Sequence, residues 1–265
     1  MKNIEIYILT HKKFKEHYDE TLYKPLLNGS FSHENDFGYL RDDNGKNISN
    51  LNYKFSELTG QYWAWKNSNA DIYGFCHYRR WFVKNLHFEK LTKEDIYNAL
   101  KDYDIILPKK VKLSKNGYDY IQYINDNFPD YDIKLEEYKK VEIVLKEHFP
   151  EYFPHYVDVM NNNYLFAYNM FICNRDIANR YFEWLFQVFE LIEPMIDYSL
   201  YSENPRIFGF LSERLLTTYV KKNKLKIKEY DILFSERKFP IFQIFYTRFP
   251  RLATFESALI KIFKP

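Results

Sequence analysis

Four polar residues directly follow an apolar run in the first third of the chain. The run at residues 72–76 has the composition of a buried strand, and it ends in His77, Tyr78, Arg79 and Arg80. In α/β proteins, ligands bind at the carboxyl ends of strands. Two guanidiniums and an imidazole could neutralise a diphosphate there without a metal, because an arginine fork fits two phosphate oxygens. The alternative is that the arginines pair with surface acids and His77 belongs to the core.

A carboxylate that could act as a general base lies in a predicted helix at residues 205–222. Arg206, Phe210 and Glu213 share one face of this helix. Gly209 lies one turn before Glu213, and glycine costs a helix about 1 kcal/mol relative to alanine. It therefore indicates close approach of a ligand or of another backbone. Glu213 is the candidate base that takes a proton from an acceptor hydroxyl; the alternative is a structural partner of an arginine.

Other polar residues lie where a sugar could be bound. Thr10 and His11 follow a predicted strand at residues 4–9, and Asn169 interrupts an apolar run at 164–173. A polar residue in a buried strand must find a partner, and a sugar hydroxyl could be that partner. The loop at 42–49 is rich in short polar groups, which suit sugar hydroxyls and tight turns equally well.

No metal is expected. Two Asp-x-Asp strings occur, at residues 102–104 and 130–132. The first precedes the apolar run of a predicted strand, and the second lies in a loop. Neither follows the carboxyl end of a strand, where a metal would meet a ligand. Cys76 and Cys173 lie in apolar runs and are expected to be buried, reduced thiols.

The predicted elements alternate between strands and helices, which indicates an α/β fold with a mainly parallel central sheet flanked by helices. Helix 92–101 has Thr92 as a plausible N-cap before Asp95. Apolar runs predict the strands, and residues 3–4 apart on one face predict the helices. The strands are expected at 4–9, 71–77, 103–107, 164–173 and 226–232, and the helices at 52–67, 92–101, 177–192 and 205–222.

The charge and hydropathy of the chain argue against a nucleic-acid-binding protein and against a membrane-spanning protein. The net charge is +2, from 38 basic and 36 acidic residues, so no nucleic-acid partner is expected. The first residues lack the pattern of a signal peptide. No apolar window reaches the roughly 18 residues of a membrane span. We therefore expect a cytoplasmic protein.

The chain resembles a family of bacterial glycosyltransferases of capsule and O-antigen synthesis that transfer galactofuranose. Two segments are the most distinctive: SELTGQYWAWKN at 56–67 and DIYGFCHYRRWF at 71–82. Further matches, in the same order, are THK (10–12), DDNGKNIS (42–49), YDIILPKK (103–110), YNMFICNRD (168–176), EWLF (183–186) and RIFGFLSERLL (206–216). The chain departs from the family mainly at 13–41.

The resemblance implies a GT-A-like fold and inverting transfer from UDP-galactofuranose to a lipid-linked or growing glycan. The resemblance also places the following residues in or near the substrate-binding cleft: Thr10, His11, Asp43, Asn47, Glu57, His77, Arg79, Arg80, Asn169, Arg206 and Glu213. We expect Glu213, His77, Arg79 and Arg80 to be catalytic and the others to bind substrate. The alternatives are a transferase using a UDP-pyranose and a non-catalytic sugar-binding subunit of a polysaccharide assembly complex.

The last residues differ from the rest of the chain. Residues 239–265 carry basic side chains between aromatic and aliphatic ones, with Glu256 as the one acid. This tail could rest on an anionic membrane surface, where a lipid-linked acceptor would be. The alternative is a helix that packs on the core or forms a homo-oligomer. We therefore expect a transferase domain at 1–238 followed by this tail.

Overall fold

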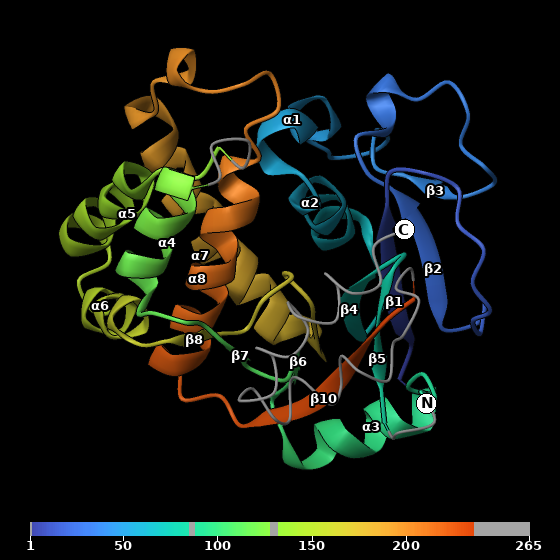
Figure 1. Ribbon diagram of the computed structural model, residues 1–265. Coiled ribbons are helices and arrows are strands. Elements are labelled where there is room, and N and C mark those ends of the chain that lie inside the picture. Colours follow the sequence, from blue (N-terminus) through green and yellow to red (C-terminus); the bar gives the residue numbers. More distant parts are fainter. Residues whose placement is uncertain (1, 85–87, 128–131, 236–265) are drawn as a thin grey trace, which may run out of the picture.

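A computed structural model describes residues 2–84, 88–127 and 132–235. The expected tail at 239–265, and with it the domain boundary at residue 238, lies outside the described residues. An eight-stranded sheet forms the centre (Figure 1). Its strands are, in spatial order, β3 (Leu40–Arg41), β2 (Tyr23–Leu27), β1 (Ile4–Thr10), β4 (Ile72–His77), β5 (Arg80–Val83), β10 (Ile227–Phe234), β6 (Ile105–Pro108) and β9 (Phe171–Asn174).

The α/β class is confirmed, but the sheet is mixed rather than mainly parallel. The pairs β1–β2, β2–β3, β1–β4 and β6–β10 are parallel, whereas β4–β5, β5–β10, β4–β9 and β6–β9 are antiparallel. The physical reason is clearest at β5, which follows β4 after two residues and so can only pair with it as a hairpin. Because β4 pairs with both β5 and β9, the strands β4, β5, β10, β6 and β9 close into a ring.

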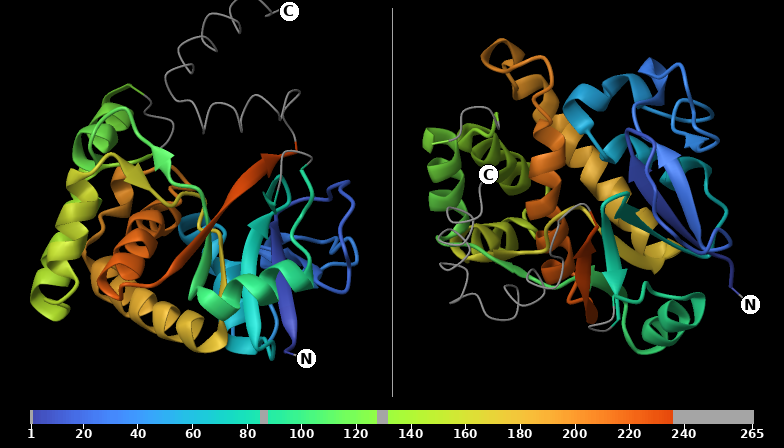
Figure 2. Two further views of the ribbon diagram at one scale, coloured as in Figure 1. Left: turned by 90° about the horizontal axis from the view of Figure 1, so that it is seen from below. Right: turned by 45° about the vertical axis from the view of Figure 1, so that its right-hand side comes forward.

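Helices cover both faces of the sheet. The group α4 (Gly117–Asn127), α5 (Leu135–His148) and α6 (Phe153–Asn161) lies at the end of the molecule opposite β1–β3, as two further views also show (Figure 2). The helix α7 (Arg175–Ile192) packs on β4 and β9, and α8 (Ile207–Lys222) packs on α6 and α1 (Asn52–Phe55). The remaining elements are α2 (Leu58–Asn67), α3 (Lys93–Asp102), and the small sheet of β7 (Val111–Lys112) and β8 (Tyr164–Leu165).

Alternation along β1 divides the core into two layers. Tyr7 and Leu9 pack into the larger cluster with α2, α7 and α8, whereas Ile6 and Ile8 pack into the cluster beneath α3. Successive side chains of a strand point to opposite faces of the sheet. Because both faces are covered at β1, its side chains on both faces are mostly apolar, and the strand appears in the sequence as a nearly continuous apolar run. Among the described residues, no helix has both the length and the hydropathy of a membrane span.

Most predicted elements are present, with two informative breaks. The predicted N-cap at Thr92 is confirmed, because Thr92 accepts a hydrogen bond from the amide of Asp95; the Asp95 carboxylate accepts one from the amide of Thr92, which completes a capping box. The predicted helix at 52–67 is divided at Ser56, whose φ is +54°. The predicted strand at 164–173 is divided into β8 and β9 by a turn that contains Asn169. Both breaks lie at the cavity described below.

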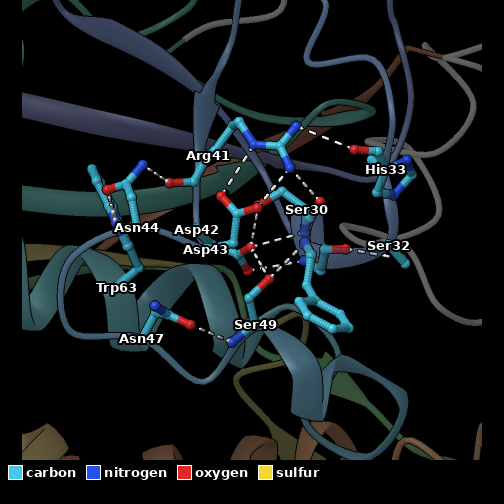
Figure 3. Close-up of polar contacts among 12 residues, drawn as sticks. Ser30, Ser32, His33, Arg41, Asp42, Asp43, Asn44, Asn47, Ser49 and Trp63 are labelled. Carbon is cyan, nitrogen blue, oxygen red and sulfur yellow. Dashed lines mark hydrogen bonds and ion pairs between the residues drawn. The ribbon is translucent and has the colours of Figure 1, made fainter.

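The polar loop at 42–49 is held by the buried carboxylate of Asp42 (Figure 3). Asp42 is 0% exposed and accepts hydrogen bonds from the amides of Gly29 and Ser30, both at 2.9 Å. The hydroxyls of Ser30 and Ser49 also donate to it, at 2.8 and 2.5 Å. A buried acceptor of four bonds fixes the loop to the end of β2, so part of this polar segment serves tight turns.

Replacing Asp42 with alanine should destabilise the fold by about 3 kcal/mol or more, because two buried amides and two hydroxyls lose their acceptor. Denaturant unfolding measures the change. The matched control is Asp43→Ala, which removes the neighbouring, partly exposed carboxylate that pairs with Arg41 at 2.6 Å. That pair should contribute no more than about 1 kcal/mol. Equal losses in the two variants would contradict this account of the loop.

Candidate active site

A cavity of about 540 Å³ lies where β1, the β4–β5 hairpin, the α1–α2 junction and the start of α8 meet. Segments far apart in sequence therefore contribute to one site. Eight of the residues predicted from the sequence line it: Thr10, His11, Glu57, His77, Arg79, Arg80, Arg206 and Glu213.

The four polar residues after the apolar run form a hairpin rather than the end of an isolated strand. His77 pairs with Arg80 across β4 and β5, which leaves Tyr78 and Arg79 as the two turn residues. The amide of Tyr78 donates to the carbonyl of Leu9 in β1, at 3.2 Å. The turn is thus fixed against the neighbouring strand, and it presents both arginines to the cavity.

Aromatic rings hold the two guanidiniums. The guanidinium of Arg80 lies 4.7 Å from the ring centre of Tyr168 and 5.8 Å from that of Phe234. The guanidinium of Arg79 lies 5.6 Å from the ring of Tyr78. Burial lowers the pKa of Arg80 from its usual value, but an arginine stays charged in proteins. Within the described part of the chain, Nε of Arg80 is buried and makes no hydrogen bond.

Glu213 faces the cavity from α8. The amide of Tyr168 donates a hydrogen bond to its Oε1, at 2.7 Å. Burial raises the pKa of Glu213 to about 7; the Tyr168 hydrogen bond acts against this, and the nearby negative charge of Glu57 adds to it. Near pH 7 this carboxyl can therefore exchange a proton, as a general base requires.

Glu57, at the start of α2, has a different electrostatic environment. Burial acts to raise its pKa, but His77, the Asn169 amide and Arg206 outweigh this and lower it. Nδ2 of Asn169 donates to Oε1 of Glu57 at 2.7 Å, and Nη2 of Arg206 lies 3.8 Å from Oε2. The two carboxyls of the cavity thus have pKa values shifted in opposite directions, an arrangement that gives neighbouring acids different roles.

Asn169 lies behind Glu57 and does not line the cavity. Its side chain is 2% exposed, and Nδ2 also donates to the carbonyl of Gly209 at 2.8 Å. The hydroxyl of Ser212 donates to Oδ1 of Asn169, also at 2.8 Å. The hydrogen-bond partners of this buried side chain are therefore protein groups, not a sugar hydroxyl.

The close approach expected at Gly209 comes from the α1–α2 junction. A Cβ atom at Gly209 would lie 3.3 Å from Cβ of Ser56 and 3.7 Å from the carbonyl oxygen of Phe55. The absence of a side chain at Gly209 allows α8 to pack against the segment that carries Glu57. Nε of Arg206 further joins the two elements by donating to the hydroxyl of Ser56, at 3.0 Å.

His77 is only 8% exposed, and its Nε2 lies 2.7 Å from the carbonyl oxygen of Tyr168. Burial lowers the pKa of His77 to about 4, against the effect of the Glu57 carboxylate, which raises it. Its ring is therefore neutral near pH 7. This differs from the cationic role expected from the sequence, and it leaves Arg79 and Arg80 to supply the positive charge in this part of the cavity.

The structure does not bring Asp43 and Asn47 to the cavity. Asp43 pairs with Arg41, and Oδ1 of Asn47 accepts a hydrogen bond from the amide of Ser49 at 3.2 Å (Figure 3). Both lie in the loop that Asp42 anchors. Asn28, Asn52, Tyr53 and Tyr168 line the cavity but were not predicted. Asn28 follows β2, which the sequence analysis missed, and Tyr168 adjoins Asn169 in the predicted strand.

Metal-binding side chains are not clustered in the described ranges: they contain no group of three or more His, Cys, Asp or Glu residues that could hold an ion. Asp104 accepts a hydrogen bond from the amide of Lys226, and Asp132 accepts one from Ser202. Asp130 lies outside the described residues. Cys76 and Cys173 are buried free thiols, as expected.

Comparisons with known proteins give two matches. Residues 5–224 match the family model described as domain of unknown function, DUF4422. The chain is also similar to the apo structure of WbbM, a bifunctional glycosyltransferase, with a TM-score of 0.78 and 29% sequence identity. The match covers 89% of this chain and 46% of WbbM, so the chain spans about half the length of that protein. No curated protein matches the chain.

Proposed function

The chain belongs to the DUF4422 family, and from its cavity and its similarity to WbbM we propose that it is a glycosyltransferase with a GT-A-like fold. It transfers galactofuranose from UDP-galactofuranose to a lipid-linked or growing capsule or O-antigen glycan, with inversion at the anomeric carbon. The family resemblance at residues 56–67 and 71–82 supports the choice of donor.

One observation carries the proposal: the cavity brings two arginines and a carboxyl of raised pKa together from distant segments. Arg79 and Arg80 come from the β4–β5 hairpin, and Glu213 comes from α8, more than a hundred residues later. A sugar nucleotide needs positive charge beside its diphosphate, and an inverting transfer needs a base beside the acceptor. Both requirements are met in one cavity.

The reaction follows as a direct displacement. Glu213 takes the proton of an acceptor hydroxyl while that oxygen forms a bond to the anomeric carbon of the donor sugar. The bond from this carbon to the diphosphate oxygen breaks with its electron pair, and UDP leaves. Arg79 and Arg80 stabilise the negative charge that develops on the diphosphate, a type of contribution that is often the largest in catalysis.

Activity should persist in excess EDTA, because the two guanidiniums supply the charge that a divalent metal supplies elsewhere. Initial rates of UDP release with EDTA and with added manganese should be equal within experimental error. Strict dependence on manganese would contradict this role for the arginines and would require a metal held by carboxylates such as Glu57 and Glu213.

The value of kcat/KM should rise with pH and level off above about pH 7. The base must be ionised, and burial raises the pKa of Glu213 to about 7. The bound donor adds negative charge beside Glu213, so the corresponding limb of the kcat profile should lie at a higher pH. A rate that stays constant from pH 5 to pH 8 would show that another group is the base.

A donor screen tests the proposed function. The protein is incubated with a panel of octyl hexopyranosides as acceptor probes and with UDP-galactofuranose made in situ from UDP-galactopyranose by a mutase. Transfer that requires the mutase supports the furanose donor. Transfer from UDP-pyranoses without the mutase supports the first alternative, and saturable sugar binding without turnover supports the non-catalytic subunit.

Membrane contact and homo-oligomer formation are also proposals. The acceptor is lipid-linked, and the basic, aromatic composition of residues 239–265 would suit an anionic surface. Binding of the full chain to anionic vesicles, compared with a variant truncated at residue 238, measures this contact. Light scattering gives the oligomeric state.

A further inference from the structure

The hydrogen bond between His77 and Tyr168 determines which nitrogen of the imidazole ring carries a proton. Nε2 of His77 lies 2.7 Å from the backbone carbonyl oxygen of Tyr168. A carbonyl oxygen can only accept, so Nε2 must be the donor and must be protonated. In the neutral ring Nδ1 then carries a lone pair, and it is the nitrogen left for a ligand.

A strained turn holds that carbonyl group. Tyr168 and Asn169 have φ angles of +76° and +51°, a region that residues other than glycine rarely adopt. Such strain persists only where surrounding contacts impose it, and the fully bonded side chain of Asn169 supplies those contacts. From the same residue, the amide of Tyr168 donates to Glu213. The turn therefore orients His77 and Glu213 together.

The surroundings of His77 keep its ring neutral at the pH where Glu213 would act. Burial has the largest effect and lowers the pKa of His77 to about 4; Glu57 raises it, and Arg80 and Arg79 lower it. In the described structure Nδ1 takes part in no hydrogen bond, although His77 lines the cavity. A residue whose free lone pair can only accept thus lines the same cavity as two donors, Arg79 and Arg80.

We propose that Nδ1 of His77 accepts a hydrogen bond from one hydroxyl group of a substrate sugar, which makes His77 a residue that determines substrate specificity. The inference rests on the proposed function. It follows from complementarity: a sugar hydroxyl can donate to Nδ1, whereas the oxygens of an ionised diphosphate cannot. The lone pair of Nδ1 therefore disfavours a phosphate group beside His77. Arg79 and Arg80 favour a phosphate group at the adjacent position. His77 thus separates the sugar part of the site from the diphosphate part.

The test uses substrates in which one hydroxyl at a time is replaced by fluorine, which cannot donate a hydrogen bond. One series varies the UDP-galactofuranose donor and a second varies the octyl hexopyranoside acceptor. The kcat/KM of the wild type should fall roughly tenfold or more with the one analogue that lacks the hydroxyl recognised by His77. The series to which this analogue belongs shows whether the hydroxyl lies on the donor or on the acceptor.

The variant His77→Gln assigns that hydroxyl to His77. Its side-chain amide can still donate to the Tyr168 carbonyl, but it leaves no acceptor at the position of Nδ1. It should lose about as much activity on the normal substrates as the wild type loses on that analogue. On the analogue itself it should show no further loss, which is the coupling that a direct contact produces. His77→Asn, whose Oδ1 lies near the position of Nδ1, should keep the discrimination.

Three results would overturn the inference. The first is a His77→Gln variant that discriminates against every analogue as strongly as the wild type does. The second result applies if thermal melting shows that His77→Gln does not fold. It is a folded His77→Asn variant that has lost the discrimination between the analogues. In both, the wild type still transfers the sugar and the proposed function stands. The third is a folded wild type that transfers nothing, which removes the proposed function and this inference with it.

Discussion

Glu213→Gln should lower kcat by about 10²–10⁴-fold, the usual contribution of a general base, without unfolding the protein. Gln has almost the same shape, and its Oε1 can still accept the hydrogen bond that the Tyr168 amide donates at 2.7 Å. What is lost is the ability to take the acceptor proton. Rates of UDP release and of sugar transfer measure the effect.

The stability of the same variant has a predictable sign. The folded-state pKa of Glu213 is raised from 4.5 to about 7, so the folded state holds an extra proton between these values. Wild-type stability should therefore fall as the pH rises through this window. Glu213→Gln does not bear that cost, and its Tm at pH 8 should equal or exceed that of the wild type.

A control separates burial from catalysis. Glu142, on α5, also has a pKa raised by burial but lies outside the cavity. Glu142→Gln should therefore keep full activity. If Glu213→Gln retained more than a tenth of wild-type kcat, or if Glu142→Gln lost activity to the same degree, Glu213 would not be the base.

Arg79→Ala should nearly abolish transfer while the fold stays intact. Removing one donor group from a site of developing charge costs about 3–4 kcal/mol, or roughly 10²–10³ in kcat. Arg79 lies in the hairpin turn, and its side chain packs against one face of Tyr78. The loss should therefore appear in kcat, with little change in Tm.

Arg80 should respond to substitution in two ways. Its guanidinium packs against Tyr168, so Arg80→Ala should lower both kcat and Tm. Arg80→Lys keeps the charge but not the planar fork, and it should recover only part of the activity. The matched control is Arg180→Ala, which removes an exposed arginine of α7 outside the cavity and should leave kcat unchanged. Full activity in Arg79→Ala and Arg80→Ala would exclude arginine stabilisation of the leaving group.

The elements with strong periodicity could be predicted from the sequence. The buried strands β1 and β4 read as apolar runs, and α7 and α8 read as amphipathic helices. The missed strands lacked this signal. β5 has only four residues and directly follows the hairpin turn, and β2 contains Pro25, which argues against a central strand. Without β5 the hairpin was not visible, and a mainly parallel sheet was the natural expectation.

The site could be predicted in part for the same reason. Residues next to strand ends or on a marked helix face, such as Thr10, His77 and Glu213, line one cavity. Tyr168 was missed because its backbone contacts to His77 and Glu213 depend on a positive φ, which a tyrosine rarely adopts, and its ring contact with Arg80 depends on the tertiary fold. Asn169 was expected to face the sugar, but whether a buried amide bonds to ligand or protein depends on tertiary contacts.

The most direct test of the account is an NMR analysis of the product that the wild-type protein forms from UDP-galactofuranose and an octyl hexopyranoside. The account predicts a new galactofuranose residue in β linkage on the acceptor and one UDP released for each sugar transferred. An α-linked product would contradict the inverting mechanism and the role of Glu213. Transfer of a pyranose alone, or no new sugar on any acceptor of the panel, would contradict galactofuranosyl transfer itself.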